Sequence, residues 1–145
     1  MLPAEAIREA AKLIEAGWSQ GAAARDGNGR EVPLHVGAER AGITPEAVAF
    51  SVYGALATIM RRERVVRTAL VFDVLYRLAA GANDQAPGGT NYVHPVLAFN
   101  DATERTKDEV LALLADAAEQ CEQIGDGTFP SPIPIPVPAA EAVRP

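Results

Sequence analysis

The stretch "TKDEVLALLADAAEQCEQIG", residues 106–125, decides the fold class. Thr106 and Glu109 stand in the T-x-x-E order of a capping box, in which both side chains bond the first free N–H groups of a helix. Gly125 is a suitable stop after the last helical residue. Between them, apolar residues recur at helical spacing: Val110, Leu114, Ala117, Cys121 and Ile124. The stretch therefore predicts an amphipathic helix with one buried face.

A helix is also predicted at the start of the chain, from about Pro3 to Ala16. Proline suits the first helical position, where no N–H is needed, and Gly17 supplies a stop. The apolar stripe of this helix consists of Ile7, Ala10, Ala11 and Ile14, widened by Leu13.

The middle of the chain, Pro45 to Ala80, predicts two helices. Thr44 suits an N-cap and Pro45 a first helical position, whereas the arginine-rich "RRERVVR" at 61–67 interrupts the apolar pattern. Because helices of globular proteins rarely reach such a length, we expect two helices that meet near 61–67. Gly54 costs about 1 kcal/mol relative to alanine in a helix. A face of small residues would let another helix approach closely there: Ser51, Gly54, Ala55 and Thr58.

Residues 18–34, "WSQGAAARDGNGREVPL", predict a small irregular β-hairpin. The sequence "DGNG" tolerates positive φ and therefore suits a turn between 18–25 and 30–34. The fold class is thus mainly α, with a single small helical domain at 1–125 and one short hairpin. Residues 126–145 are expected to form a separate, extended, proline-rich C-terminal tail.

The composition limits the classes of function. A formal net charge of -6 disfavours a general affinity for nucleic acid or for anionic membranes. The single cysteine, Cys121, excludes an intrachain disulfide and a cysteine metal cluster, and fits a reducing compartment. The N-terminus is charged, so no signal peptide is visible, and the longest uncharged run, Ala47 to Met60, is shorter than the roughly 20 residues that span a bilayer. We therefore expect a cytoplasmic protein.

The tail contains "FPSPIPIPVP", residues 129–138, with proline at every even position. In an extended chain Ile133, Ile135 and Val137 share one face, and their N–H groups point to one edge. Such a segment can pair with a sheet edge, form a stiff polyproline II spacer, or remain a disordered tail. The interpretation that we favour is a docking arm, which runs across its own domain or onto a neighbouring copy.

Two stretches, "AAKLIEAGWSQGAAARDGNGR" and "FNDATERTKDEVLALLADAAE", resemble an uncharacterised family of small helical proteins from actinobacteria and their phages. Its members pair a GWCQGA-like and ARD-x-DG-like segment with a WND…RT-x-EV-like final helix. Ser19 and Phe99 depart from the cysteine and tryptophan of that pattern. The resemblance implies origin and fold, and no known activity. The matching positions are Gly17, Trp18, Gln20, Gly21, Ala22, Arg25, Asp26, Gly29, Asn100, Asp101, Arg105, Thr106, Glu109, Val110 and Leu114.

Four residues on or beside the hairpin form the first candidate site. Trp18, Gln20, Arg25 and Asp26 can make a polar recognition patch with an aromatic anchor. Alternatively, Trp18 packs on the first helix, and the two charged residues shape the turn.

A second group, Asn100, Asp101 and Arg105, suggests a carboxylate that is oriented by an arginine. Asn and Asp before a helix more often make local backbone hydrogen bonds. His35 and His94 are far apart in the sequence and lack H-x-x-x-H spacing, so no metal or cofactor is expected.

Residues 38–51 have the small, turn and core residues of a helix-turn-helix corner. The second helix of that corner offers almost no donors for base edges. Arg61, Arg62, Arg64 and Arg67 form a local basic patch, whereas residues 101–126 carry eight acids and two bases. This polarity can serve self-association as well as DNA binding.

The sequence is therefore interpreted as a non-enzymatic protein–protein interaction or assembly protein, an accessory protein of a phage or mobile element. Its expected partner is another protein or a second copy. The alternative is a small DNA-binding regulator that uses the 38–51 corner and the 61–67 arginines. An enzyme would need Arg25, Asp26, Asn100 and Asp101 to meet in a pocket with a histidine.

Overall fold

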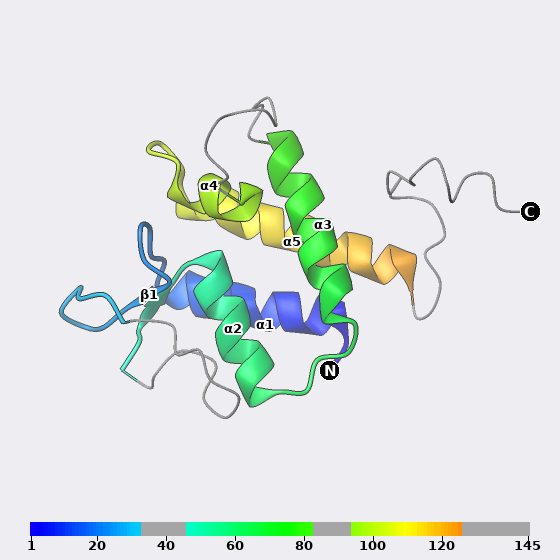
Figure 1. Cartoon of the computed structure of the whole chain (residues 1–145), viewed down its shortest axis with the longest axis horizontal. Helices are drawn as coiled ribbons and strands as arrows, with labels where there is room; N and C mark the ends of the chain where they lie inside the picture. Colours follow the sequence, from blue (N-terminus) through cyan, green and yellow to red (C-terminus); the bar gives the residue numbers. More distant parts are fainter. Residues whose placement is uncertain (33–45, 83–93, 126–145) are drawn as a thin grey trace, which may run out of the picture.

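The computed structural model describes residues 1–32, 46–82 and 94–125. The described chain is mainly α, as predicted, and its elements are shown in Figure 1. Ile133, Ile135 and Val137 lie outside the described residues. The helices are α1 (Pro3–Ala16), α2 (Val52–Arg62), α3 (Thr68–Ala82), α4 (Pro95–Asp101) and α5 (Lys107–Ile124), and the strands are β1 (Ala24–Arg25) and β2 (Ala49–Phe50).

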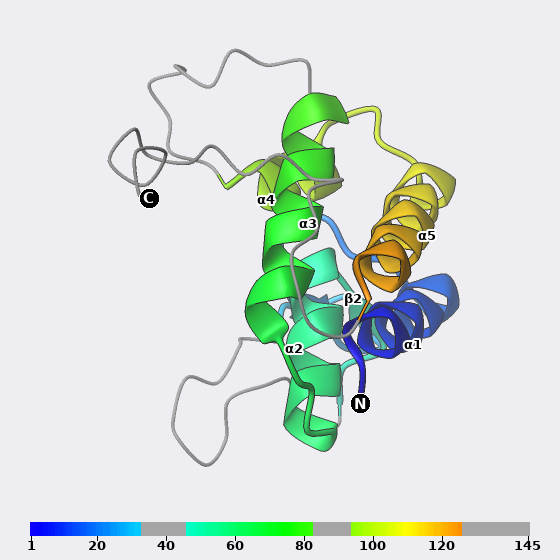
Figure 2. The ribbon, with the colours of Figure 1, turned by 90° about the vertical axis from the view of Figure 1, so that its right-hand side faces the viewer.

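The helices form two layers. In one layer α1 and α5 lie side by side and run in opposite directions, and α2 and α3 cover one face of that pair (Figures 1 and 2). The core lies between the layers, where apolar side chains of four helices are fully buried: Ile7, Ile14, Leu56, Leu75 and Leu114. Burial of such side chains is the main favourable term in the stability of the domain.

The predicted capping box of α5 is confirmed. The Thr106 hydroxyl accepts from the Glu109 N–H at 3.2 Å, and the Glu109 carboxylate accepts from the Thr106 N–H at 2.9 Å. The backbone hydrogen bond from Thr106 lowers the pKa of Glu109. The whole predicted apolar series from Val110 to Ile124 is buried, so the pattern identified the core face correctly.

The predicted helix start at Pro45 is wrong. Residues 46–51 are not helical, and α2 begins at Val52 with Ser51 as its N-cap. The second helix of the expected helix-turn-helix corner is therefore absent over 46–51, and residues 38–45 lie outside the described part of the chain. Residues 48–51 are extended in spite of their helical propensity, because their backbone forms hydrogen bonds with neighbouring segments on both sides.

Strand β2 is hydrogen-bonded along both edges. On one edge β1 pairs with it antiparallel, with Ala24 opposite Phe50. On the other edge the Ser19 N–H donates to Phe50 O, and the Phe50 N–H donates to Gly17 O. The backbone of residues 17–19 thus provides a third, bridging segment.

The predicted turn at 26–30 is present, and a short antiparallel pairing closes it. The Asp26 N–H donates to Arg30 O, the Val32 N–H donates to Ala24 O, and Arg25 lies opposite Glu31. Within the described residues the pairing involves 24–26 and 30–32, and residues 33–34 of the predicted hairpin lie outside them. Strand β1 therefore also has partners on both edges, 49–50 and 31–32.

Gly54 permits a close approach, but not that of a helix. A Cβ at position 54 would lie 1.9 Å from the Ala23 carbonyl oxygen, so the backbone of the loop before β1 packs directly on α2. The Ser51 hydroxyl donates to the same oxygen at 3.3 Å and accepts from the Gly54 N–H at 3.1 Å. At Gly54, the small-residue face thus receives a loop and not the predicted helix.

The two middle helices meet at the arginine cluster, as predicted. Arg67, in the linker before α3, has a positive φ of 55° and donates from its guanidinium to Gly125 O. The Met1 ammonium group donates to Arg64 O, and the Val66 N–H donates to Met1 O. The chain start, the α2–α3 linker and the end of α5 therefore converge. Within the described ranges, no helix has the length and apolarity needed to cross a bilayer.

Replacement of Gly54 by alanine tests the loop contact. We expect Gly54→Ala to lower the free energy of unfolding by about 1–3 kcal/mol, because the new methyl group forces the Ala23 backbone away. Gly81→Ala is the matched control: Gly81 also lies in a helix, but a Cβ there meets nothing within 4 Å. That variant is expected to be neutral, or more stable by up to about 1 kcal/mol. Urea unfolding measures the change in unfolding free energy of both variants. Equal changes would contradict the close contact between Gly54 and the Ala23 backbone.

Candidate functional site

The buried side chain of Asn100 joins three segments of the chain. Its Oδ1 accepts from Trp18 Nε1–H at 3.1 Å and from the Val52 N–H at 3.2 Å. Its Nδ2 donates to Ser19 O at 2.9 Å and to Asp101 Oδ1 at 2.8 Å. Since Asn100 is only 1% exposed, these four bonds replace water on every polar group of the amide.

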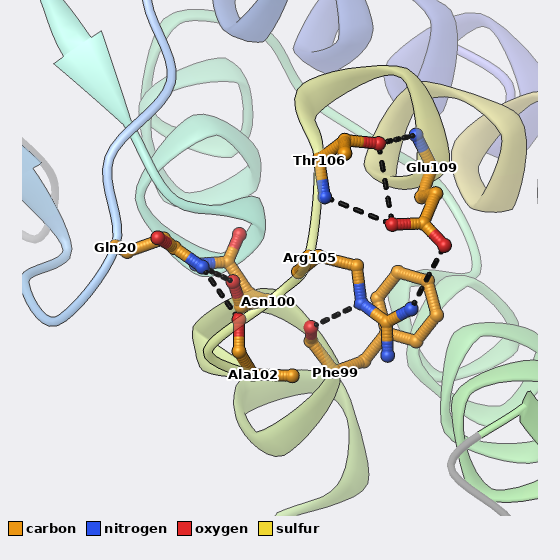
Figure 3. A network of polar contacts seen from close by, with 7 residues as sticks. All are labelled: Gln20, Phe99, Asn100, Ala102, Arg105, Thr106 and Glu109. Carbon is orange, nitrogen blue, oxygen red and sulfur yellow. Dashed lines mark hydrogen bonds and ion pairs between the residues drawn. The ribbon is translucent and has the colours of Figure 1, made fainter.

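The loop 18–21 caps the C-terminal end of α4 (Figure 3). Gln20 Nε2 donates to Asn100 O at 3.1 Å and to Ala102 O at 2.9 Å. The Gly21 N–H donates to Asp101 Oδ1 at 3.0 Å. Carbonyl groups at a helix C-terminus have no partner within the helix, so Gln20 provides one from a distant segment.

Arg105 connects α4 with α5. Its Nε donates to Phe99 O at 2.8 Å, and its guanidinium carbon lies 3.6 Å from the centre of the Phe99 ring. Nη1 also contacts Glu109, the capping residue of α5, at 3.4 Å (Figure 3). A cation over an aromatic face is favourable in itself, and here it also links α4 with the start of α5.

Arg25 and Asp26 shape the turn beside β1. Arg25 donates from Nη2 to Gln20 O at 2.9 Å and from Nη1 to Gly29 O at 3.2 Å. Asp26 Oδ1 accepts from the N–H groups of Asn28 and Arg30, each at 2.9 Å. Such bonds are typical of an aspartate-initiated turn.

The structure therefore brings Trp18, Gln20, Asn100 and Asp101 together in one network. Arg25 joins that network through the Gln20 carbonyl, whereas Asp26 bonds its own turn. In the described part of the chain, no buried side-chain polar atom lacks a partner. Contact of Trp18, Gln20, Arg25 and Asp26 with another protein stays a prediction, because the bonds within the chain do not test it.

Aromatic rings from three helices form a second candidate site, the aromatic surface, which sequence reasoning missed. The rings belong to Tyr53, Phe72, Tyr76 and His94. His94 lies edge-on to Tyr53 and Tyr76, with ring centres 5.2 and 5.3 Å apart, and Tyr53 stacks on Phe72 at 6.1 Å. Tyr76 is 46% exposed. The four rings come from α2, α3 and the N-cap of α4, so no local sequence pattern signals their meeting.

His94 has a structural role in this surface. As the N-cap of α4 it accepts the Val96 N–H at its Nδ1, at 3.2 Å, and burial lowers its pKa. Burial likewise raises the pKa of Tyr53. His35 lies outside the described residues. Among the described residues, no three His, Cys, Asp or Glu side chains are grouped as metal ligands would be.

Cys121 lies in the core between the helix layers. Burial raises the pKa of its thiol to about 11, so the thiol is protonated at neutral pH. A protonated, buried thiol is a poor nucleophile.

The exposed charges are segregated. Arg61, Arg62 and Arg64 are exposed at the end of α2, accompanied by Glu63; we call them the basic patch. The exposed side of α5 presents Asp108, Asp116 and Glu119, which we call the acidic stripe. Glu122 on the same helix is bonded to Arg8 of α1 at 2.6 Å, and this bond lowers the pKa of Glu122.

A family model, "Family of unknown function (DUF6197)", matches residues 1–120, and the chain belongs to that family. No curated protein matches the chain. No solved structure matches it either. The matched region contains the whole Asn100 network.

The isosteric change Asn100→Asp tests the network. We expect a loss of about 2–4 kcal/mol in unfolding free energy, because a carboxylate cannot donate to Ser19 O and is repelled by Asp101. The matched control is Asp101→Asn, which keeps an acceptor for the Gly21 N–H and should cost less than about 1 kcal/mol. Urea unfolding followed by the fluorescence of Trp18, the single tryptophan, measures both. A mild effect of Asn100→Asp would show that the network is dispensable.

The pH dependence of stability tests the role of His94. Because its pKa is lowered in the folded chain, the unfolded chain binds the proton more tightly, and stability falls as the pH drops through the ordinary value of 6.5. An asparagine at this position would retain an N-cap without titrating. His94→Asn should therefore reduce the loss of stability at low pH, and the variant should gain most in unfolding free energy below pH 6.5. His35 is present in both chains, so the difference between them reports His94. Parallel pH profiles would contradict the assignment.

Proposed function

We propose that the protein is a non-enzymatic assembly protein that binds a second copy of itself through opposite charges. The observation that carries this proposal is the segregation of exposed charge between the basic patch on α2 and the acidic stripe on α5. Most polar side chains of the motif segments, by contrast, bond the chain itself, which suits a structural role better than a reactive one.

The basic patch has the composition of a contact surface. Arginine is enriched in protein interfaces because its planar group forms paired hydrogen bonds with carboxylates. Val66, which is 46% exposed, and Leu2, which is 51% exposed, lie at the same junction, since Val66 bonds the backbone of Met1. The patch therefore combines charge with exposed apolar area.

The acidic stripe offers the complementary surface. Ala112 and Ala115 are exposed between its acidic residues, and such small side chains let a partner approach the helix closely. The two surfaces belong to different parts of the fold, so each copy can offer its basic patch to one neighbour and its acidic stripe to another. Heterologous contact of this kind builds a ring or a chain of copies.

The origin and location are part of the proposal. The paired motif segments support an actinobacterium or one of its phages as the source. The single cysteine supports a reducing compartment, the cytoplasm of the bacterial host.

Sedimentation velocity of the full chain tests the proposal. We expect concentration-dependent association that weakens at least about tenfold between about 50 mM and about 500 mM NaCl, because salt screens exposed charges. Arg61→Glu/Arg64→Glu should abolish the association, and Lys12→Glu/Arg30→Glu, with the same change in net charge elsewhere, should not. Mixing the first variant with Asp116→Arg/Glu119→Arg should restore it between the two chains. Monomers at every salt concentration would overturn the proposal.

DNA binding is the competing explanation of the exposed arginines. Without the second helix of the 38–51 corner, it depends on the basic patch alone, and the net charge of -6 opposes it. Adding duplex DNA to the same samples distinguishes DNA binding from self-association. DNA binding would be favoured if the chain stays monomeric and forms complexes with DNA that weaken steeply as salt is added. Arg61→Glu/Arg64→Glu should then remove these complexes.

A further inference from the structure

The aromatic surface has a stripe of exposed residues leading to it along α3. Val66, just before the helix, is 46% exposed; Ala69 is exposed; Phe72 is half-buried; and Tyr76 is 46% exposed. Residues 69, 72 and 76 are separated by three and four positions, so they lie along one side of the helix. Leu97, one turn beyond His94 on α4, is 38% exposed. An apolar segment lying along residues 69, 72 and 76 would remove these side chains from water.

The end of the described chain lies near the start of α3, the helix that carries the stripe. The Gly125 carbonyl accepts from the guanidinium of Arg67, the residue directly before α3. From Arg67 to Tyr76 the helix rises by about 14 Å, at 1.5 Å per residue. Residues 126–132 span about 23 Å when extended. The tail can therefore bring Ile133 to the level of Tyr76 of its own chain.

The sheet offers the tail no equivalent place among the described strands. β1 bonds residues 49–50 on one edge and 31–32 on the other, and β2 bonds β1 and residues 17–19. Adding the tail to either strand would displace existing backbone hydrogen bonds. Pairing with these strands, one of the interpretations of the tail sequence, is therefore disfavoured.

The chemistry of the aromatic surface suits a proline-rich segment. Proline-rich segments that bind aromatic-lined grooves do so in the polyproline II form, in which their carbonyl groups accept hydrogen bonds while the prolines donate none. Residues 129–138 lack the P-x-x-P spacing of such ligands, so Ile133, Ile135 and Val137 would supply the contacts with the rings. Tyr53 and Tyr76 carry hydroxyl donors. Because His94 Nδ1 accepts the Val96 N–H, the neutral ring carries its hydrogen on Nε2, which gives a third donor. Residues 133–138 of the tail are all apolar.

We propose that the proline-rich segment 129–138 docks in cis on the aromatic surface formed by Tyr53, Phe72, Tyr76 and His94. A covalent link through a short tail gives the segment an effective concentration in the millimolar range on its own surface. Docking in cis therefore outcompetes docking on a second copy at ordinary protein concentrations. This inference does not depend on the self-association through charge.

Photo-crosslinking of the full chain tests the docking. A photoreactive benzoylphenylalanine replaces Tyr76, and mass spectrometry maps the products at about 1 μM protein. We expect crosslinks to residues 129–138 of the same chain. The same reagent at Ala115, exposed on α5, should yield none to the tail. Crosslinks from position 76 to other segments only, or none at all, would overturn the proposal.

Two matched variants establish the sequence requirement. Ile133→Ser/Ile135→Ser/Val137→Ser should reduce the tail crosslink at least about tenfold, because three apolar contacts are lost. Ala139→Ser/Ala140→Ser/Ala142→Ser should leave it unchanged. An equal reduction in both would overturn specific docking. A mixture of isotopically light and heavy chains separates cis from trans, and light–heavy crosslinks to 129–138 would overturn docking in cis.

Discussion

The arrangement of this domain depends on one buried carboxamide. An amide placed in an apolar core without partners costs several kcal/mol, and Asn100 is tolerated at 1% exposure because all of its polar groups are bonded. Those bonds come from Trp18, Ser19 and the start of α2. Loop, α2 and α4 must therefore hold one relative position, since a displacement of any of them would leave a buried polar atom unpaired.

The position of this loop explains why residues 17 and 54 are glycines, which the rules for helix ends and helix interiors alone do not explain. The loop held by Asn100 passes so close to α2 that a Cβ at position 54 would lie 1.9 Å from Ala23 O. At the start of the same loop, a Cβ at position 17 would lie 2.2 Å from the carbonyl oxygen of Val48, just before β2. Gly17 has an extended φ of -170°, so close approach, and not a left-handed conformation, is what requires glycine there. Both contacts place backbone against backbone, which lets short strands pair within a helical domain.

The sequence predicted those parts of the fold that local physics determines. α1, α5 and the capping box follow from spacing and capping, and the break between α2 and α3 follows from the arginine cluster. The predicted start of α2 was wrong because residues 48–51 have ordinary helical propensity. They become extended only through backbone hydrogen bonds with residues 17–19 and 23–25. The meeting of Trp18 and Gln20 with Asn100 spans about 80 positions, and the aromatic surface joins three helices. No local pattern encodes such contacts.

The two motif segments contribute side chains that bond other parts of the fold. Gln20 caps α4, Arg105 holds α4 against α5, and the Asp26 carboxylate orders its turn. A side chain committed to such bonds cannot leave them for a substrate without a loss in stability. The basic patch, the acidic stripe and Tyr76 are exposed, and they take no part in the bonds of the Asn100 network described above. Substitutions there would leave those bonds intact.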